Sequence, residues 1–333
     1  MAIESKTESQ IAAYERLTPD LILQAIESVE LEPTGSLLAL NSYENRVYQV
    51  ELADDSFIIA KFYRPERWSD AAIMEEHQFS YELGDQDIPV VCPMMREGYS
   101  LLEHEGYRFA LYPRRGGRWP ELEDPQTLQQ LGRLIGRIHA IGRTDKFEFR
   151  QRLTVANYGR VALDYLLENE FVPSELLHNF QQAAQALLDQ VETMFEAIAP
   201  TYLRIHGDFH PGNILSMDQN FHFVDLDDCC MGPAIQDLWM MLSGEPHEMA
   251  GQLKDILEGY ETFTSFDYSE IALIEALRGL RLIYYCGWLA RRWKDPAFPK
   301  HFPWFNTPRY WEEQMITFRD QLERCFAPTL DLK

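Results

Sequence analysis

The chain has 333 residues, 46% of them hydrophobic and 25% charged, with a formal net charge of −23. This length is too great for one small core and predicts two lobes or two domains, in a composition typical of globular proteins. The acidic balance excludes nucleic acid as a partner, because phosphates repel it and no basic stripe is interleaved with aromatic residues.

Cysteine usage and apolar patterning indicate the compartment. No spacing among the five cysteines suits a zinc site, and the vicinal pair Cys229–Cys230 is poorly placed for an ordinary disulfide. Free thiols are typical of a reducing compartment. The first residues are mostly polar, and no apolar run reaches the length of a membrane span. We therefore expect a cytoplasmic protein, taken as a monomer, with no membrane partner.

The first third of the chain alternates between helix and strand signals. Thr18 and Pro19 are typical of a helix cap and a first-turn proline, and apolar residues follow at helical spacing. Ser69 caps a second predicted helix, which Gly84 ends. β-branched and aromatic runs predict strands at 46–52, 57–62, 88–91 and 108–112.

A change of composition at residues 110–118 indicates a hinge, because proline and paired glycines there separate strand patterns from helical ones. Helices are predicted at 125–142, 174–198, 233–243, 246–262, 268–293 and 307–325, and short strands at 202–205, 214–216 and 222–226. The sequence thus predicts an α+β fold with a small β-rich N-terminal lobe, residues 1–112, and a large helical C-terminal lobe, residues 113–333.

Two polar strings stand out in the second lobe. The string H-G-D-F-H-P-G-N-I-L begins at His206 and lies between apolar runs, so it is expected to be a loop held by strands. The string F-V-D-L-D-D begins at Phe223 and places Asp225 at the end of a buried-looking strand. Buried carboxylates at this density repel one another and normally need a cation or a shared proton.

Phosphoryl transfer requires groups of these types. It needs a carboxylate that takes the proton of the acceptor hydroxyl, oxygen ligands for Mg²⁺ and a cation on the nucleotide phosphates. Asp208 at the head of D-x4-N is the candidate base, and Asn213 with Asp225 are the candidate metal ligands. The order is that of protein-kinase catalytic loops, with H-G-D in place of H-R-D.

The third requirement points to the N-terminal part. The strand F-I-I-A-K ends in Lys61, which would contact the α- and β-phosphates of ATP. A glutamate of the following helix would pair with this lysine. We favour Glu76, because the apolar pattern of its helix then faces the core, and Glu75 stays open as the alternative.

Each of these residues also has a plain structural interpretation. A lone lysine is usually a surface residue, an asparagine after Pro-Gly is usually a turn residue, and His139 on an apolar helix face is expected to be a core histidine. His206, Asp208 and His210 also form an H-x-D-x-H pattern that a metallohydrolase would use. That alternative leaves Lys61 and Asn213 unexplained.

The same residues resemble the aminoglycoside phosphotransferase and choline kinase group of the protein-kinase-like superfamily. Within it, further segments are similar to bacterial serine/threonine protein kinases of stress response. These are L-N-S-Y-E-N-R-V-Y-Q-V from Leu40, K-F-Y-R-P-E-R-W from Lys61, E-E-H-Q-F from Glu75, G-P-A-I-Q-D-L-W from Gly232 and R-R-W-K-D-P-A-F-P-K from Arg291. The resemblance spans nearly the whole chain.

The resemblance implies a bilobal protein-kinase-like fold, ATP as co-substrate and Mg²⁺. It makes Asp208 the base, Asn213 and Asp225 metal ligands, Ser42 a nucleotide contact, and Asp237 the helix carboxylate that braces the catalytic loop. Residues 40–47 lack G-x-G-x-x-G, so Ser42 and backbone amides would cradle the phosphates. No A-P-E element follows Asp225, and the extended segment that holds a peptide in ordinary protein kinases is missing.

Three functions are compatible with these patterns. The resemblance favours an ATP- and Mg²⁺-dependent serine/threonine protein kinase with protein substrates. A small-molecule hydroxyl kinase of the same fold is the alternative, and the acidic C-terminal lobe would suit a cationic acceptor. A nucleotide-binding regulator without turnover is disfavoured, because every residue that the chemistry needs is present.

Overall fold

A computed structural model describes residues 14, 16–218 and 220–332. The chain divides into two compact units: unit 1 contains residues 1–119 and 212–227, and unit 2 contains residues 120–211 and 228–333. The sequence suggested one cut near residue 112. In the structure, a segment from far along the chain, residues 212–227, joins the N-terminal unit instead.

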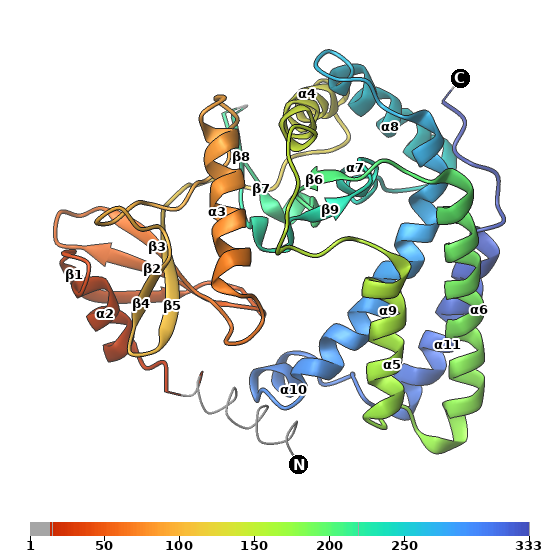
Figure 1. Ribbon diagram of the computed structural model, residues 1–333, viewed down its shortest axis with the longest axis horizontal. Helices are drawn as coiled ribbons and strands as arrows, with labels where there is room; N and C mark the ends of the chain where they lie inside the picture. The colour runs from red at the N-terminus through yellow and green to blue at the C-terminus, as the bar shows by residue number, and fades with distance from the viewer. Residues whose placement is uncertain (1–13, 15, 219, 333) are drawn as a thin grey trace. The chain divides into compact units, whose positions relative to one another are not determined.

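Unit 1 is built on a five-stranded antiparallel sheet in the order β1-β2-β3-β5-β4 (Figure 1). Its strands are β1 (Pro33–Ala39), β2 (Arg46–Leu52), β3 (Phe57–Phe62), β4 (Leu102–His104) and β5 (Tyr107–Pro113). Two helices accompany the sheet, α2 (Pro19–Glu27) and α3 (Asp70–Gly84). The caps Thr18 and Ser69 accept the Leu21 and Ala72 backbone N–H groups, as predicted.

Strand alternation decides which helix each residue of β3 faces. Ile58 and Phe62 point to one side, where they share a hydrophobic core with α2 residues such as Ile22 and Ile26. Lys61 and Tyr63 alternate to the other side, where Tyr63 packs with Ile73 of α3. Lys61 therefore faces α3 rather than the main core.

The strands at 46–52 and 57–62 are confirmed residue for residue. The strand predicted at 88–91 is wrong: apart from an isolated bridge between Val90 and Phe223, the segment is irregular. Pro89 lies within the segment and Pro93 lies two residues beyond it, and neither can donate to a ladder. Strands β1 and β4 were not predicted.

A two-stranded hairpin completes unit 1, formed by β7 (Ile214–Met217) and β8 (Asn220–Phe223). The strand predicted at 222–226 is thus wrong at its end, since β8 stops at Phe223. Asp225 lies two residues later with a left-handed φ of 61°, which no strand residue adopts.

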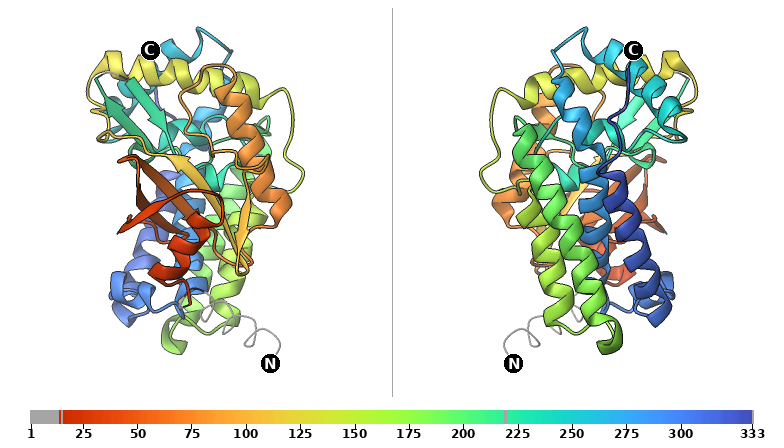
Figure 2. Two further views of the ribbon diagram at one scale, coloured as in Figure 1. Left: turned by 90° about the vertical axis from the view of Figure 1, so that its left-hand side faces the viewer. Right: turned by 90° about the vertical axis from the view of Figure 1, so that its right-hand side faces the viewer.

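Unit 2 is mainly helical. Its longer helices are α4 (Pro125–Gly142), α5 (Val161–Glu168), α6 (Ser174–Ile198), α8 (Pro246–Tyr260), α9 (Ile274–Arg292) and α11 (Pro308–Arg324). Helix α6 packs against α9 and α11, and α5 packs against α9, so these four helices run side by side (Figure 2). Helix α4 packs against α8.

Several shorter elements of unit 2 differ from the prediction. Of the helix predicted at 233–243, only α7 (Gln236–Trp239) is α-helical. The helix predicted at 268–293 begins as a 3₁₀ segment at Tyr268–Leu273. A π-helical turn at Val155–Arg160, helix α10 (Ala297–His301) and strand β9 (Cys230–Gly232), which pairs with β6 (Leu203–Ile205), were not predicted.

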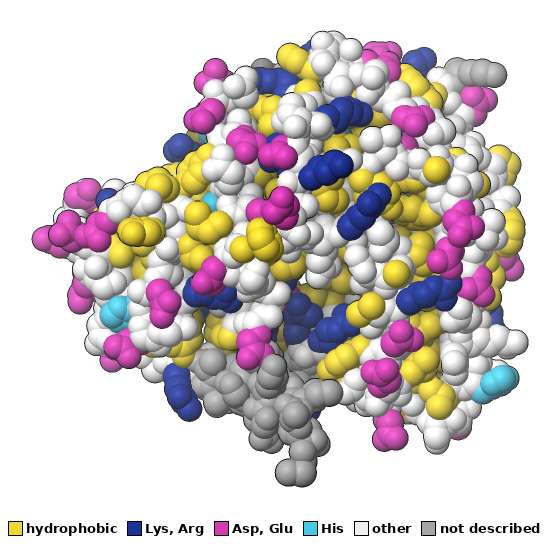
Figure 3. Space-filling view, in the orientation of Figure 1, with side chains coloured by type: hydrophobic (Ala, Val, Ile, Leu, Met, Phe, Trp, Pro, Cys, Tyr) yellow, Lys and Arg dark blue, Asp and Glu magenta, His cyan; other side chains and the backbone are white. Residues whose placement is uncertain are grey.

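Three further features of the chain concern its thiols, its helices and its surface charges. All five cysteines are free. Among the described residues, none of the helices combines the length and apolar character needed to cross a lipid bilayer. Acidic and basic side chains are interspersed on the face that Figure 3 shows.

Candidate active site

A buried lysine organises the charged residues of unit 1. The Lys61 Nζ atom lies 3.4 Å from Glu76 Oε1, 3.3 Å from Asp225 Oδ1 and 2.9 Å from Asp227 Oδ1. Burial alone would lower the pKa of Lys61, but the carboxylates of Asp227, Glu76 and Asp225 raise it well above its usual value. The side chain is thus an ammonium ion held by carboxylates, and not the surface lysine of the plain interpretation.

The helix partner of Lys61 is Glu76, the favoured candidate. Its side chain is buried, with 4% exposed, whereas Glu75, at the preceding position of α3, is half-buried. The geometry follows from the fold, because α3 covers the face of the sheet toward which Lys61 points.

Further charged residues extend this cluster beyond Asp227. Arg67 pairs with Asp227 and also lies 3.5 Å from the Glu44 carboxylate. Glu44 in turn lies 3.2 Å from the Arg64 guanidinium. The buried carboxylate of Asp227 is therefore satisfied by two cations, which offsets the cost of its desolvation.

Asn213 and Asp225 meet at one end of the β7–β8 hairpin. Ile214 pairs with Phe223, and the Val224 N–H donates to the Asn213 carbonyl oxygen at 3.1 Å. The Asp225 side chain is 53% exposed, so the prediction that it is buried is wrong. The Asp225 carboxylate and the Asn213 side-chain oxygen are hard oxygen ligands of the kind that Mg²⁺ takes in proteins.

Ser42 lies half-buried in the loop between β1 and β2. The loop is tied to the residue after β3: the Arg64 N–H donates to Asn45 Oδ1 at 3.1 Å, and Arg64 Nε donates to the Glu44 carbonyl oxygen at 2.9 Å. These bonds fix the loop close to the strand that carries Lys61.

In unit 2, Asp208 follows β6 in a loop that a buried aspartate holds. Asp237 on α7 accepts the backbone N–H groups of His206 and Gly207, both at 2.8 Å. It also bonds His139 Nε2 at 3.1 Å, whose other ring nitrogen bonds Tyr260. Asp237 thus braces the loop as expected, and His139 is a satisfied core histidine.

Gly207 explains why H-G-D stands where protein kinases have H-R-D. Its φ is 84°, in the left-handed region that favours glycine. A Cβ at this position would collide with the Asp228 carbonyl oxygen and approach Cys230 Sγ to 3.3 Å. An arginine could not occupy this position without moving the backbone.

The Asp208 carboxylate lies between Arg281 and His210. Arg281 Nη1 on α9 donates to Asp208 Oδ1 at 2.8 Å, and His210 Nε2 lies 3.4 Å from Asp208 Oδ2. Burial would raise the pKa of Asp208, but the bonds to His210 and Arg281 hold it well below its ordinary value. The group is therefore a carboxylate, able to accept a hydrogen bond from a hydroxyl.

The H-x-D-x-H alternative finds little support in this geometry. The ring of His206 is buried edge-to-face against Phe209, with ring centroids 5.1 Å apart. In the part of the chain that the structure describes, no three His, Cys, Asp or Glu residues are grouped so that they could hold a metal ion.

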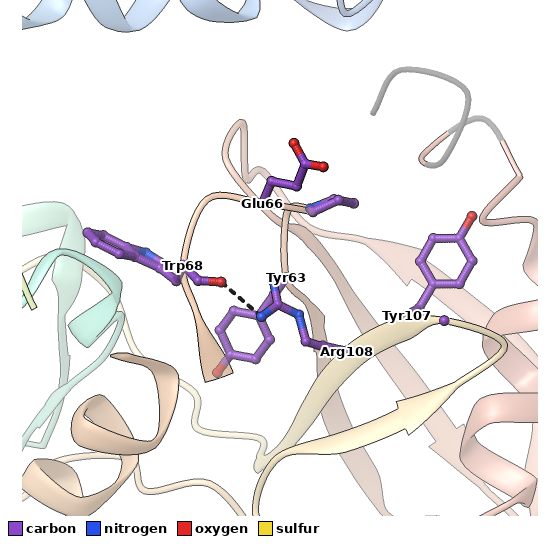
Figure 4. A pocket seen from close by; sticks show the side chains of 7 residues that line it. Tyr63, Glu66, Trp68, Tyr107 and Arg108 are labelled. Atoms are coloured by element: carbon purple, nitrogen blue, oxygen red, sulfur yellow. Dashed lines mark hydrogen bonds between the residues drawn. The ribbon is translucent and has the colours of Figure 1, made fainter. Parts of the chain in front are cut away.

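A pocket of about 330 Å³ lies elsewhere in unit 1, between the β3–α3 connection and the β4–β5 hairpin (Figure 4). Arg108 Nη1 donates to the Trp68 carbonyl oxygen at 2.8 Å and to Asp70 Oδ1 at 2.6 Å. The lining includes Tyr63, Glu66 and Tyr107 but none of the predicted site residues.

Sequence reasoning gave no role to five charged residues of these groups, Asp227, Arg67, Arg64, Glu44 and Arg281. The density of acids in F-V-D-L-D-D was a signal for Asp227. No local pattern marked Arg281, because its contact with Asp208 joins residues 73 positions apart.

The sequence matches a family model and several known proteins. Residues 36–274 match the model of the phosphotransferase enzyme family. Stress response kinase A of Salmonella choleraesuis (strain SC-B67) is 44% identical over 319 residues, which cover 96% of this chain and 97% of that protein. A relative from Salmonella typhimurium with the same identity and coverage is named serine/threonine protein kinase RdoA.

Solved structures confirm the predicted fold. The amicoumacin kinase hAmiN, in complex with AMP-PNP, Ca²⁺ and Ami, superposes with a TM-score of 0.73 at 19% identity, covering 96% of this chain and 98% of that one. A microcompartment-associated aminopropanol kinase gives a TM-score of 0.69 at 17% identity, covering 95% and 100%. The chain belongs to the phosphotransferase enzyme family.

Proposed function

We propose that this ATP-dependent phosphotransferase is a cytoplasmic serine/threonine protein kinase that uses Mg²⁺ and acts in stress response. The observation that carries the proposal is the Lys61 ammonium, held between the buried Glu76 of α3 and the carboxylates that follow β8. A lysine so placed is a fixed point charge for nucleotide phosphates. Free cysteines are in keeping with a reducing compartment.

In this proposal, unit 1 supplies the nucleotide and metal groups. Lys61 contacts the α- and β-phosphates, and Ser42 with nearby backbone amides cradles them. Asn213 and Asp225 hold Mg²⁺, which neutralises phosphate charge when it is bound. The structural support for the metal ligands is the hairpin, whose last backbone bond brings the two residues together.

Unit 2 supplies the base. Asp208 orients the acceptor hydroxyl and takes its proton as the hydroxyl oxygen bonds to the γ-phosphorus atom and the bond to the ADP oxygen breaks. The bonds from the His206 and Gly207 amides to Asp237 support this role, because they fix the backbone that carries the carboxylate.

The names of the relatives favour a protein as acceptor. They are about 44% identical over nearly the whole chain, and one is called a serine/threonine protein kinase. Structural neighbours whose titles name small molecules, such as amicoumacin and aminopropanol, are below 20% identical and speak for the fold alone.

Incubation with γ-labelled ATP and Mg²⁺ tests the proposal. Generic protein acceptors and a panel of hydroxyl-bearing small molecules are offered side by side. We expect label on serine or threonine of protein, and loss of labelling in Asp225→Asn. A matched control is Asp218→Asn, which changes an exposed aspartate at the turn of the same hairpin and should keep wild-type activity. Label only on a small molecule, or activity that needs zinc instead of Mg²⁺, would refute the assignment.

A further inference from the structure

Helix α9 carries a local charge opposite to that of the whole protein. From Ala276 to Lys294 there is no Asp or Glu, whereas the chain as a whole has a net charge of −23. The cations of this stretch are Arg278, Arg281, Arg291, Arg292 and Lys294.

Helical spacing gathers four residues of α9 on one face. Arg281, Tyr285, Trp288 and Arg292 follow one another at steps of four, three and four residues, and we call them the α9 face. The rings of Tyr285 and Trp288 stack with centroids 5.6 Å apart, and the Arg292 guanidinium lies 5.1 Å from the centre of the Trp288 ring. Apolar residues such as Ile283 and Leu289 occupy the buried side.

The first residue of the α9 face contacts the proposed base. Arg281 is 47% exposed and donates to Asp208 Oδ1 at 2.8 Å. Other arginines of the helix are engaged differently: Arg278 pairs with Glu275 at 2.8 Å, and Arg291 Nη2 donates to the Val161 carbonyl oxygen at 2.9 Å. Arg281 is thus the arginine that an acceptor approaching Asp208 would meet.

The charge of the α9 face opposes a cationic acceptor, which the acidic C-terminal lobe would otherwise suit. A positive group brought to Asp208 would meet Arg281, and the repulsion between like charges disfavours the binding of such a partner. The α9 face is also long: the eleven steps from Arg281 to Arg292, at about 1.5 Å each, span roughly 16 Å, the length of about five residues of extended chain. Trp288 packs against Phe298 and Phe302 and holds the Tyr285 ring, which is 40% exposed and offers contact area to a side chain of such a segment.

We propose that the α9 face selects an acidic peptide segment as acceptor. A carboxylate of the peptide near the acceptor hydroxyl would pair with Arg281 in place of Asp208. This inference rests on the proposed kinase function and specifies its substrate class. The exchange leaves Asp208 free to accept the hydroxyl proton while the phosphoryl group passes from ATP to the serine oxygen and ADP departs. Arg281 is here a specificity and positioning residue.

Three serine peptides that differ only in flanking residues, glutamate, glutamine or lysine, test this inference. The wild-type protein should phosphorylate the glutamate peptide with a kcat/KM at least tenfold above that of the lysine peptide. Arg281→Glu should reverse the order, and Arg281→Gln should abolish the difference. Arg278→Gln is the matched control, one turn earlier on α9 and paired with Glu275, and should keep the wild-type ratio.

Melting temperature and ATP binding of each variant establish that it is folded. Arg292→Glu should raise KM for the glutamate peptide with little change in kcat, because this residue lies away from Asp208 on the face. Equal kcat/KM for the three peptides, or a ratio unchanged in Arg281→Glu, overturns the inference while the kinase function stands if proteins are labelled. Label on none of the peptides and on no protein overturns both.

Discussion

The Lys61 ammonium, together with Arg67 on Asp227, makes the acidic cluster of unit 1 tenable. Glu76 and Asp227 are each buried, with about 4% of the side chain exposed, and both lie beside Lys61. Buried carboxylates without a counter-ion are strongly destabilising, whereas a paired set roughly offsets its desolvation cost. Lys61 therefore serves the fold of unit 1 as well as the proposed chemistry.

We predict that Lys61→Met lowers the free energy of unfolding by roughly 3–5 kcal/mol, the usual cost of removing one partner of a buried pair. Phosphotransfer should be lost in the same variant. Urea denaturation measures the first effect, and labelled ATP measures the second. Lys254→Met, which removes an exposed lysine of α8, is the control and should change stability by less than about 0.5 kcal/mol. A wild-type unfolding curve for Lys61→Met would show that the cluster does not need its cation.

Asp208 differs from Lys61 because its loop is held by backbone bonds. The amides of His206 and Gly207, not the side chain of Asp208, carry the contact with Asp237. Asp208→Asn should therefore keep the fold and bind ATP within a few-fold of wild type. Turnover should fall by roughly 10²–10⁴-fold, the usual contribution of a positioned proton acceptor. Single-turnover rates and ATP titration separate the two quantities, and a turnover near wild type would remove Asp208 from the role of base.

At the scale of elements, glycine allows α4 and α8 to pack with their backbones in contact. A Cβ at Gly132 would collide with the Ile256 carbonyl oxygen, and one at Gly136 would lie 2.6 Å from the Tyr260 carbonyl oxygen. The two helices hold Tyr260 against His139 and so support the brace of the Asp208 loop.

We predict opposite effects for two glycine-to-alanine changes in this helix pair. Gly132→Ala should destabilise the protein by about 1–3 kcal/mol or more, because the carbonyl it meets belongs to a helix that cannot yield locally. Gly251→Ala, on α8 with open space around it, should stabilise by about 0.5–1 kcal/mol through helix propensity. Thermal unfolding of both variants measures the contrast, and two changes of the same sign would contradict the close packing.

A buried glutamate makes stability depend on pH. Burial raises the pKa of Glu270 to about 7, although its carboxylate accepts the Ile235 N–H at 3.0 Å. Because the folded pKa lies above the unfolded one, near 4.5, the folded state binds more protons between these values and loses stability as pH rises through that window. Stability below pH 4.5 is unaffected by this group.

Glu270→Gln keeps an acceptor for the Ile235 N–H and removes the charge. We expect it to stabilise the protein at pH 8 by up to about 3 kcal/mol relative to its effect at pH 4.5. Unfolding free energies measured across this range test the slope. Glu312→Gln, at an exposed position of α11, should show no such pH dependence. A difference between variant and wild type that does not grow with pH would mean that Glu270 is ionised without cost.

Elements whose faces are consistently buried were predictable from the sequence, and marginal ones were not. The alternation of β2 and β3 and the long apolar face of α6 gave correct bounds. Strand β1 was not predicted because it contains Pro33 and Gly35 and is mostly exposed, so its sequence has no apolar alternation. The pairing of Lys61 with Glu76 was predictable from motif order, whereas the contact of Arg281 with Asp208 depends on how α9 packs in unit 2.

At the scale of the whole molecule, the proposed catalytic groups alternate between the two units along the chain. Asp208 belongs to unit 2, Asn213 and Asp225 to unit 1, and the chain returns to unit 2 at Asp228. The chain after Asp225 is compact, with a 3₁₀ turn at Leu226–Asp228, strand β9 paired with β6, and then α7. Residues 229–239 are all buried, so no long exposed segment separates Asp225 from the next helix.

This arrangement lacks both halves of a phosphorylation switch. Such switches order a long mobile segment by pairing its phosphate with arginine. Here the segment is already a buried strand and helix, and Gly207 stands where an H-R-D arginine would be, at a position that tolerates no side chain. We therefore predict that the protein is active as synthesised, so that its abundance or the availability of its target controls the output. The initial rate of enzyme stripped by a phosphatase, with complete removal of phosphate verified by mass spectrometry, should equal that of untreated enzyme. A lag that disappears after preincubation with ATP would reveal a switch elsewhere in the chain, and phosphopeptide mapping would then locate it.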